Sequence, residues 1–582
     1  MTMIPENSLQ WDSNDEELFF SLASKADYLV IDTETNSQDV RDGRGYCMGI
    51  SVALKIEPDT IVACYLPFRH KGANLQKTTL FRLKNLLENF KILVFHNAKF
   101  DLVSLQTIGI NFTGKFYDTM LMAHWVDENT YSKSLDYLVK HYCDLGGKKT
   151  TDRFKAFIKA FGWADTPASE MAEYAANDAY ITLALFEYLY PRFLNEGYEG
   201  ELWRIEQDWM RLLSKMESRG VGINTNLAEG LAATGEFLME EYADDLGFNP
   251  GSTLQLGEFF INELGLPVVK KTPKGKPCFD KEAMAYYDSI LEQRNDDRAE
   301  SVLAYRGWQK AVTSNYRAYL KLLSPDGRLR PNYKLHGTVT GRLSCEQPNL
   351  QQIPRSSTKD WNGRMKECFI PQDGYTLWEA DYSQLELRLA AAYAKERKLL
   401  EIFSDDSRDV FSEMSEQLGM DRYATKTLTY TIQYGGGITR ISHVFGVSEP
   451  RAALIKDNFY ETYSGLLTVQ KLASSKCVEQ KFLRLWTNRR RHFPRPREEA
   501  HKAFNAAIQG GAAEIVKRQG LVLGDSVDND ECRMLLQIHD AYVFEIKNGT
   551  EEQYLPEIKN LMEKVEPDFG VKFKTDVHPW VK

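Results

Sequence analysis

Acidic residues directly beside apolar runs are the residues of this sequence best suited to chemistry. Asp381 follows the apolar run 375–380, and Asp540 lies between the apolar runs 534–538 and 542–546. An acid at the end of a rigid strand can hold a hard cation through its oxygens. Two such acids on adjoining strands could bind two Mg²⁺ ions roughly 3.5 to 4 Å apart, the arrangement used for in-line phosphoryl transfer. Either acid alone is equally consistent with a turn.

A second group of acids lies in the first third of the chain. Asp32 and Glu34 are two residues apart at the end of a β-branched run, and residues i and i+2 of a strand share a face, so they can hold one metal ion together. Asp101 comes shortly after another apolar run, and Tyr174 and Asp178 share a helix face through their spacing of four. Any one of them is more often a cap or a surface charge. Their joint occurrence predicts one convergent site.

A third set recurs at every fourth position between residues 421 and 435. It combines two cations with two aromatic residues: Arg422, Lys426, Tyr430 and Tyr434. Each step of four drifts by about 40° on a helix, so the four side chains form one slowly turning stripe. Cations suit phosphates and aromatic rings suit a sugar and a base, which predicts a nucleoside triphosphate site. The alternative is an amphipathic helix whose long cations cover apolar surface.

The elements that must position these residues follow from hydrophobic period. Short apolar runs predict strands at residues 27–32, 91–95, 375–380, 534–538 and 542–546, the last two forming a hairpin with Asp540 at its turn. Helical spacing covers residues 183–193, 201–218, 283–323 and 385–403. Asp381 therefore lies where a strand gives way to a helix.

Bulk composition bounds the class of protein. A chain of 582 residues exceeds one core, and about 150 residues per domain suggests three or four units. No apolar run approaches the roughly 20 residues of a membrane span, and the eight cysteines contain no C-x-x-C pair. We therefore expect a cytoplasmic protein, or one of the host cytoplasm if the source is viral, with no membrane partner. The net charge of −10 does not decide for or against nucleic acid, because phosphate binding depends on local patches.

Three motifs of the first third resemble those of proofreading 3′→5′ exonucleases of the four-carboxylate, tyrosine-containing type. They are Asp32-Thr33-Glu34, Asn97 to Asp101 and Tyr174 to Asp178. The resemblance implies a ribonuclease H-like α/β fold. It also implies that Asp32, Glu34, Asp101 and Asp178 bind two divalent metal ions, that Tyr174 orients the attacking water, and that Asn97 contacts DNA.

The rest of the chain resembles family A DNA polymerases, the bacterial DNA polymerase I group, so that the two resemblances together extend from about residue 25 to the C-terminus. The matching stretches are Thr338 to Ser344, Gln347 to Pro354, Asp381 to Arg388, Arg422 to Gly435, Asn505 to Gly510 and His539-Asp540. The resemblance implies a right-hand fold with palm, fingers and thumb, and two Mg²⁺ ions on Asp381 and Asp540.

The same resemblance assigns contacts to individual residues. Those expected at the incoming nucleotide are Arg422, Lys426, Tyr430, Tyr434, Gln384, Glu386 and His539, with Lys426 also catalytic and Glu386 blocking a ribose 2′-hydroxyl. Those expected at DNA are Arg342, Asn349, Gln352, Asn505 and Gln509. The densest basic run adds Arg489 and Arg490, which lie close to Trp486 and Phe493 and are expected to contact nucleic acid. A solvated turn is the alternative for that run.

This sequence departs from the family pattern at three positions. Thr431 replaces the middle glycine of the stripe motif, Phe411 aligns with a histidine near the β- and γ-phosphates, and Ala541 replaces the acid that usually follows Asp540. Phe411 and a shorter segment around it concern the contact with pyrophosphate, whereas both proposed metal acids and both phosphate cations remain.

The expected architecture is an exonuclease domain at residues 1–197 and a polymerase domain at residues 198–582. Within the latter we expect a thumb at about 205–335, a palm at about 336–395 and 519–582, and fingers at about 396–518. We expect no 5′ nuclease domain, a layout shared with phage replicative enzymes and Klenow-type fragments.

The expected function is template-directed DNA synthesis with 3′→5′ proofreading in DNA replication, by a monomer. Each site would use two divalent ions, Mg²⁺ with Mn²⁺ as a substitute. Expected partners are primer-template DNA, deoxynucleoside triphosphates and replisome proteins such as a helicase-primase and a single-strand binding protein. Two alternatives stay open. A single-subunit RNA polymerase shares the palm acids but should lack Glu386 and the exonuclease. A binding protein with an inactive polymerase half would account for Phe411, Thr431 and Ala541.

Overall fold

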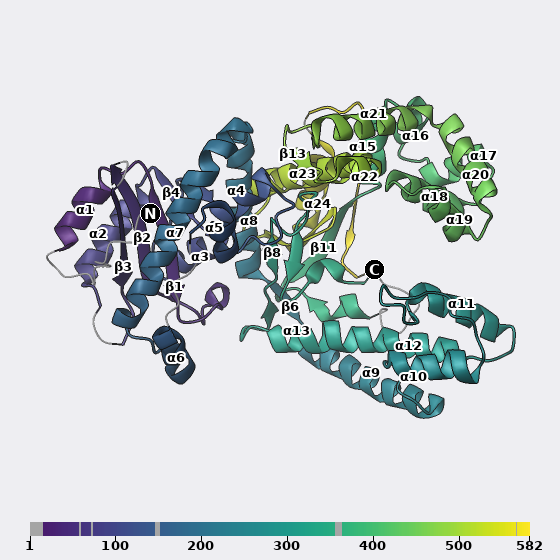
Figure 1. The fold of residues 1–582 in the computed structure, drawn as a ribbon, viewed down its shortest axis with the longest axis horizontal. Coiled ribbons are helices and arrows are strands. Elements are labelled where there is room, and N and C mark those ends of the chain that lie inside the picture. Colours follow the sequence, from purple (N-terminus) through teal and green to yellow (C-terminus); the bar gives the residue numbers. More distant parts are fainter. Residues whose placement is uncertain are drawn as a thin grey trace.

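A computed structural model describes residues 15–57, 60–71, 74–145, 152–354, 364–565 and 567–581. Figure 1 shows an α/β unit at the left, a central antiparallel sheet and two helical arms at the right, one above the other. The left-hand unit and the central sheet with the upper arm each enclose a large hydrophobic core, and the tip of the lower arm encloses a smaller one. No described helix is long and apolar enough to cross a membrane.

The α/β unit contains a mixed five-stranded sheet. Its order is β3-β2-β1-β4-β5, with bounds Thr60–Pro67, Cys47–Glu57, Leu29–Thr35, Ile92–Phe95 and Lys115–Asp118. β1 is parallel to β4 and β4 to β5, whereas β2 and β3 are antiparallel neighbours. The carboxyl ends of the parallel strands therefore meet at one edge. The predicted strands 27–32 and 91–95 are confirmed, and the mixed sheet agrees with the expected ribonuclease H-like fold.

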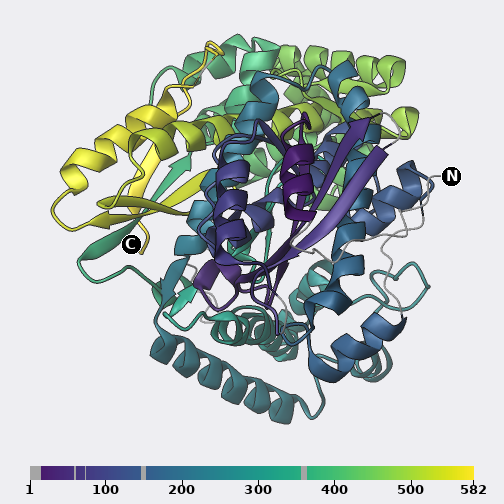
Figure 2. The ribbon, with the colours of Figure 1, turned by 90° about the vertical axis from the view of Figure 1, so that its left-hand side faces the viewer.

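Helices pack around this sheet (Figure 2). They are α1 (Asp15–Ala23), α2 (Lys77–Glu88), α3 (Ala98–Gln106), α4 (Thr119–Val126), α5 (Leu135–Tyr142), α6 (Asp152–Phe161) and α7 (Ala168–Asn195). The 28-residue α7 packs along β1, β2 and β3. It thereby brings residues 174–178 to the strand that carries Asp32 and Glu34.

The central sheet has the order β14-β15-β11-β16, and all its neighbours are antiparallel. The strands are Cys532–Ile538, Ala541–Lys547, Tyr375–Tyr382 and Thr575–Pro579. Asp381 in β11 pairs with Ala541 in β15, directly after the hairpin turn that holds Asp540. The predicted hairpin and the predicted strand before Asp381 are thus confirmed, and the register brings the two acids to neighbouring strands.

The lower arm is built from helices with small strands at its base. Its helical elements are α9 (Thr225–Leu246), α10 (Thr253–Gly257), η2 (Glu258–Glu263), α11 (Lys281–Glu292), α12 (Arg298–Lys310), η3 (Ala311–Tyr316) and α13 (Arg317–Leu322). The small strands are β6 (Val221–Ile223), β7 (Arg328–Leu329), β8 (Asn332–Lys334), β9 (Ser344–Glu346) and β10 (Phe369–Ile370). The helical prediction for 283–323 is confirmed, with a break at residues 293–297.

The upper arm consists of helices and one short hairpin. The helices are α15 (Leu385–Ala394), α16 (Arg397–Phe403), α17 (Val410–Leu418), α18 (Arg422–Gln433), α19 (Ile438–Phe445), α20 (Glu449–Thr462), α21 (Ser464–Gln480), α22 (Pro496–Glu499) and α23 (Ala503–Ser526). The hairpin is β12 (Phe482–Arg484) with β13 (Arg490–His492), and α24 (Glu551–Glu563) follows the central hairpin. α23 runs back to the central sheet (Figure 1).

One predicted helix is corrected. Helical spacing over 385–403 suggested a single element, but the structure breaks it into α15 and α16 at Lys395, which has a φ of 47°. The Glu396 carboxylate accepts a hydrogen bond from the Gly465 backbone N–H at 2.8 Å. This contact with α21 comes from tertiary packing and leaves no trace in the hydrophobic period.

Helix α8 (Glu201–Arg219) joins the two large cores. Trp203 near its start packs in the core of the α/β unit and donates from Nε1 to the Phe116 carbonyl at 2.8 Å. Trp209 and Leu213 belong to the core of the central sheet. The helix is therefore shared, and residue 197 lies just before an element that belongs to both parts.

Candidate active sites

The first candidate site lies where β1 meets α7. Asp32 and Glu34 project from β1 and Asp178 from α7, and each offers a carboxylate oxygen within 4.8 Å of the others. Three hard oxygen donors at this spacing suit a divalent cation such as Mg²⁺. The prediction that these acids converge is therefore confirmed for these three.

Asp101 on α3 lies beside this group and contacts β1. Its Oδ1 accepts from the Thr33 backbone N–H at 3.1 Å and from Thr33 Oγ1 at 2.7 Å. Burial and the charge of Asp32 raise the pKa of Asp101 well above its ordinary value. A cation bound nearby would reverse this effect by favouring the ionised form.

Tyr174 lies one helical turn before Asp178 and is half-buried. Its ring stacks on Phe154, with centroids 4.9 Å apart. Asn97 is exposed in a left-handed turn, with φ of 77°, before α3. Asp118 caps α4 by accepting from Met120 and Leu121, and it also accepts from the backbone of Asn97 at 3.0 Å. Asp118 thus holds the turn that presents Asn97.

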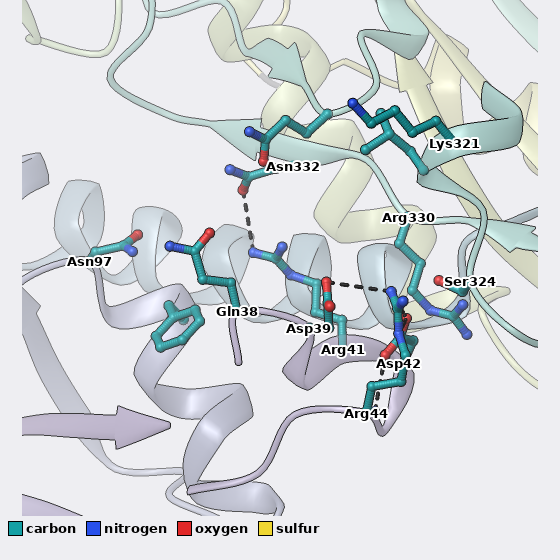
Figure 3. Close-up of a pocket in the computed structure, with 13 residues that line it drawn as sticks. Gln38, Asp39, Arg41, Asp42, Arg44, Asn97, Lys321, Ser324, Arg330 and Asn332 are labelled. Carbon is teal, nitrogen blue, oxygen red and sulfur yellow. Dashed lines mark hydrogen bonds and ion pairs between the residues drawn. The ribbon is translucent and has the colours of Figure 1, made fainter. Parts of the chain in front are cut away.

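A hollow of 490 Å³ opens beside Asn97 and Phe100 (Figure 3). The α/β unit and the base of the lower arm both line it, and its cations are Arg41, Arg44, Lys321 and Arg330. Arg44 pairs with Asp42, whereas Arg41 Nη2 donates to Asn332 across the junction at 3.3 Å. Its four cations make the hollow suited to binding anionic groups such as phosphates.

The second candidate site is a cavity of 330 Å³ over the central sheet. Several residues predicted from the sequence line it together: Arg342, Asp381, Gln384, Glu386, Tyr430, Tyr434, His539 and Asp540. Asp381 lies in β11 and Asp540 at the β14–β15 turn, where its carbonyl accepts from the Tyr382 N–H at 3.4 Å. Gln384 and His539 both have positive φ values, of 52° and 55°.

A polar network around the buried Glu386 forms one wall of this cavity. Glu386 accepts from Arg342 Nη2 at 2.6 Å and from the Tyr434 hydroxyl at 3.0 Å. Arg342 Nη2 also donates to Asp540 at 3.3 Å. Burial raises the pKa of Glu386, although the charge of Arg342 opposes that rise. Arg342 thus links the acid of the turn to the acid of α15.

Helix α18 presents the predicted stripe. Arg422 and Lys426 are exposed, Tyr430 is half-buried and Tyr434 follows the last helical residue. The Arg422 guanidinium donates twice to Asp409, at 2.9 Å in both cases. The Lys426 ammonium lies 5.6 Å from the Phe411 ring centroid, and the rings of Tyr430 and Tyr434 are 5.9 Å apart. The helix and its stripe are confirmed, and whether they bind a nucleotide stays a prediction.

The other residues predicted to contact DNA have mixed exposure. Asn349 and Gln352 are exposed around a short 3₁₀ turn, η4 (Leu350–Gln352). Asn505 and Gln509 are half-buried on one face of α23. These positions leave the predicted contacts open.

The basic run at 489–491 needs a correction. Arg489 is 4% exposed, donates from Nη1 to Glu514 at 3.3 Å and lies over the Trp125 ring at 5.0 Å. Arg490 forms an ion pair with Glu196 at the end of α7. Arg489 therefore joins the α/β unit to the rest of the chain instead of contacting DNA, and the paired Arg490 is not a free cation. Glu196 and Glu128, which pair with Arg490 and Arg491, lie far from the run in the sequence, so the run alone suggested an exposed basic patch.

Sequence reasoning missed several residues of the two sites. Thr33, in the first motif, donates a hydrogen bond to Asp101. Its position between Asp32 and Glu34 could have identified it as part of the site. Lys366, Glu379 and Trp580 line the second cavity, with Lys366 Nζ donating to Glu379 at 2.6 Å. Glu379 lies two residues before Asp381 and so on its face of β11, a periodicity that could have identified it.

Family comparisons match almost the whole described chain. The model for DNA polymerase family A matches residues 223–579, and the model for a 3′-5′ exonuclease matches residues 11–193. The unmatched interval between them contains α8, the helix that both cores share.

Curated relatives agree with these models. The chain is 29% identical to DNA polymerase I of Pseudomonas aeruginosa, over 92% of its own length and 61% of that protein. It is 28% identical to DNA polymerase I of Rhizobium leguminosarum, over 92% and 56%, and 29% identical to that of Synechocystis, over 93% and 58%. The chain thus spans somewhat more than half the length of these relatives.

A solved structure shares the fold. The polymerase domain of Pol1 from M. smegmatis, in complex with DNA primer-template and dNTP, matches with a TM-score of 0.83 over 98% of both chains. At 22% sequence identity this comparison concerns the fold alone.

Proposed function

The chain belongs to DNA polymerase family A and carries a 3′-5′ exonuclease domain, and from that premise we propose that it is a template-directed DNA polymerase that also shortens primer 3′ ends. The observation that carries the proposal is the cavity over the central sheet. There Asp381 and Asp540, 159 positions apart in sequence numbering, line one space with Arg342, Glu386 and Tyr434. Family membership supplies the reaction class, and this cavity identifies the residues proposed to perform it.

In the polymerase site, Asp381 and Asp540 would hold divalent metal ions, preferably two Mg²⁺. Bound there, the ions lower the pKa of the attacking hydroxyl and neutralise phosphate charge. Arg422 and Lys426 would bind the triphosphate, with Arg422 exchanging Asp409 for phosphate oxygens. Tyr430 and Tyr434 would pack against the sugar and the template base. Most of the catalytic work is then positioning and charge stabilisation by preorganised groups.

In the exonuclease site, Asp32, Glu34, Asp101 and Asp178 would hold the divalent ions, with Mn²⁺ as a substitute for Mg²⁺. The Tyr174 hydroxyl would orient the attacking water. Mispaired ends separate more easily than paired ones, so they would reach this site as single strands. The hollow lined by Arg41, Lys321 and Arg330 lies beside Asn97 and would guide the backbone of that strand.

The domain division proposed for this function is the one expected from the sequence. Residues 1–197 would form the exonuclease domain and residues 198–582 the polymerase domain. The lower arm would be the thumb, at about 205–335. The upper arm would be the fingers, at about 396–518, and residues 336–395 and 519–582 would form the palm. Primer-template DNA and deoxynucleoside triphosphates would be its substrates, in DNA replication with replisome proteins as partners.

Primer extension tests both activities. A labelled primer on a longer template would be incubated with the protein and Mg²⁺, with and without the four deoxynucleotides. We expect extension with them and 3′ shortening without them. Asp540→Asn should abolish extension only, and Asp32→Ala should abolish shortening only. Shortening without extension in the unchanged protein would contradict the proposed polymerase function.

A further inference from the structure

Arg489 is enclosed between three parts of the protein. Its Nη1 donates to Glu514 of α23 at 3.3 Å, and its Nη2 lies 3.3 Å from His124 Nε2 on α4. Its guanidinium also lies over the ring of Trp125. Burial and the charge of Arg489 lower the pKa of His124 well below its ordinary value, so the imidazole is neutral and its Nε2 can accept. One side of the guanidinium is therefore bound to the exonuclease domain.

The other side of Arg489 rests on Gly341. Gly341 has a φ of 84°, and a Cβ added there would overlap the guanidinium, with Cζ only 3.0 Å away. Within the same loop, the Thr338 hydroxyl donates to the Arg342 carbonyl at 2.7 Å, which closes residues 338–342 into a tight turn. Arg489 is thus packed directly against a compact turn, which we call the 338–342 turn.

The residue that follows Gly341 reaches the polymerase site. Arg342 donates to Glu386 and to Asp540, so its guanidinium orients both the proposed metal acid and the acid that contacts Tyr434. A shift of the 338–342 turn would move this guanidinium. Positional errors of about 1 Å in such groups can cost roughly 100-fold in rate.

We infer that Arg489 is a positioning residue for DNA synthesis, acting on Arg342 through the 338–342 turn. Because the same guanidinium is bound to α4, the exonuclease domain serves as the fixed support for this turn. The inference rests on the proposed polymerase function. Arg489 thereby has a role at the cavity over the central sheet, although it does not line that cavity.

The same hairpin offers a matched control in Arg491. Its Nη1 donates to Glu128 of the exonuclease domain at 2.8 Å, and its side chain is 11% exposed. Both arginines therefore make interface ion pairs, but Arg491 has no contact with the 338–342 turn among the interactions of the described residues. Each acid keeps a second partner after substitution, since Lys517 Nζ lies 3.5 Å from Glu514 and His492 Nδ1 lies 2.9 Å from Glu128. Both variants should therefore fold.

The test is a double-mutant cycle in single-nucleotide incorporation with Mg²⁺. Arg489→Met should lower kcat/KM about tenfold, mainly through kcat, and should add little to the loss caused by Arg342→Ala. Arg489→Lys should recover part of the activity. Arg491→Met by itself should leave kcat/KM within about twofold of the value for the unchanged protein. Combined with Arg342→Ala, its effect on kcat/KM should be fully additive. The inference would be overturned if the effects of Arg489→Met and Arg342→Ala on kcat/KM were fully additive. It would also be overturned if Arg489→Met and Arg491→Met lowered kcat/KM equally.

A second readout does not depend on activity. Hydrogen exchange of residues 338–342 should accelerate in Arg489→Met but not in Arg491→Met. Gly341→Ala, which places a Cβ against the guanidinium, should reproduce the effect from the other side. Absence of extension by the unchanged protein would contradict the proposed function, whereas unchanged exchange at 338–342 would contradict this inference.

Discussion

Several donors fix the Glu386 carboxylate at the wall of the cavity over the central sheet. It lies between Arg342 and Tyr434 and receives a further contact from Gln433 Nε2 at 3.3 Å. These donors hold a bulky carboxylate in one position at the wall of the polymerase cavity. A fixed obstruction of this kind rejects a substrate through the clash that it creates.

Substitution Glu386→Ala should therefore weaken discrimination against ribonucleotides by roughly tenfold or more. The removed carboxylate is the group expected to meet a 2′-hydroxyl. The measurement is the ratio of kcat/KM for a deoxynucleotide and its ribonucleotide, with Glu386→Gln as a control of similar size. Discrimination that does not change in the Ala variant would favour the RNA polymerase alternative.

Asp409 pairs with Arg422, the arginine that we propose to bind phosphate. It holds Arg422 in two hydrogen bonds, and the guanidinium holds the pKa of Asp409 well below its ordinary range. Asp409 also caps α17 by accepting from Ser412 N at 2.7 Å. Replacement by serine keeps a residue suited to capping but removes the charge.

Substitution Asp409→Ser should lower KM for deoxynucleotides by about two- to fivefold, because an exposed ion pair of at most about 1 kcal/mol no longer has to open. Arg422→Ala should raise KM and should cancel the effect of Asp409→Ser in the double variant. Steady-state kinetics at fixed primer-template measures both. A raised KM in Asp409→Ser alone would show that the acid assists nucleotide binding instead.

At the scale of elements, the β12–β13 hairpin binds the exonuclease domain to the polymerase domain. Arg491 and His492 contact Glu128, the His492 carbonyl accepts from Asn129 Nδ2, and Arg489 lies against His124. His124 is 1% exposed, and its pKa is depressed by burial first and by Arg489 next. The interface therefore contains a group that titrates differently in the folded and unfolded chain.

The sign of the pH dependence follows from this depressed pKa. Below about pH 6.5 the unfolded chain binds a proton at His124, whereas the folded chain does not, so stability falls as pH decreases. His124→Gln keeps an acceptor for Arg489 and removes the proton site. We expect a flatter dependence of Tm on pH between pH 7 and 5 in that variant. Parallel curves for the two proteins would contradict a role for His124.

At the scale of the whole molecule, the tips of the two arms touch. His443 Nδ1 on α19 lies 2.8 Å from a Glu282 carboxylate oxygen on α11, and Lys270 shares that acid at 3.2 Å. In Figure 1 these helices lie one above the other at the right-hand side. The contact joins the ends of the arms proposed as fingers and thumb, although an exposed pair of this kind is weak and can open.

A covalent link at this contact should block loading onto circular DNA. The parent protein would carry Cys143→Ser and Cys278→Ser, because those two thiols are partly exposed. Glu282→Cys and His443→Cys would be added to it, and a cleavable bis-maleimide would join the two new thiols. Linked before a primed circle is added, the protein should extend the primer at least tenfold less, and cleavage should restore extension. Each single Cys variant is the control. Normal extension by the linked protein would mean that DNA enters by another route.

Local pattern was enough to predict most elements and the acids at their ends. Alternation and apolar runs located β1, β4, β11 and the β14–β15 hairpin, since a buried strand imposes its composition on the sequence. The spacing of the motifs indicated the acids of both candidate sites, because the period of the side chains follows directly from backbone geometry. The break between α15 and α16 escaped because neither the positive φ of Lys395 nor the contact of Glu396 with α21 leaves a trace in the hydrophobic period.

Long-range packing decided the rest. The sequence of residues 489–491 suggests a basic patch, but Glu196 after α7, Glu514 of α23 and Glu128 after α4 neutralise it in the fold. The link from Arg489 through Gly341 to Arg342 likewise joins segments nearly 150 positions apart. The sequence by itself determined which chemical groups exist and on which elements they lie, because those depend on local periodicity. Only the tertiary structure decided which charges are buried, paired or open to a substrate, because burial depends on neighbours distant in the chain.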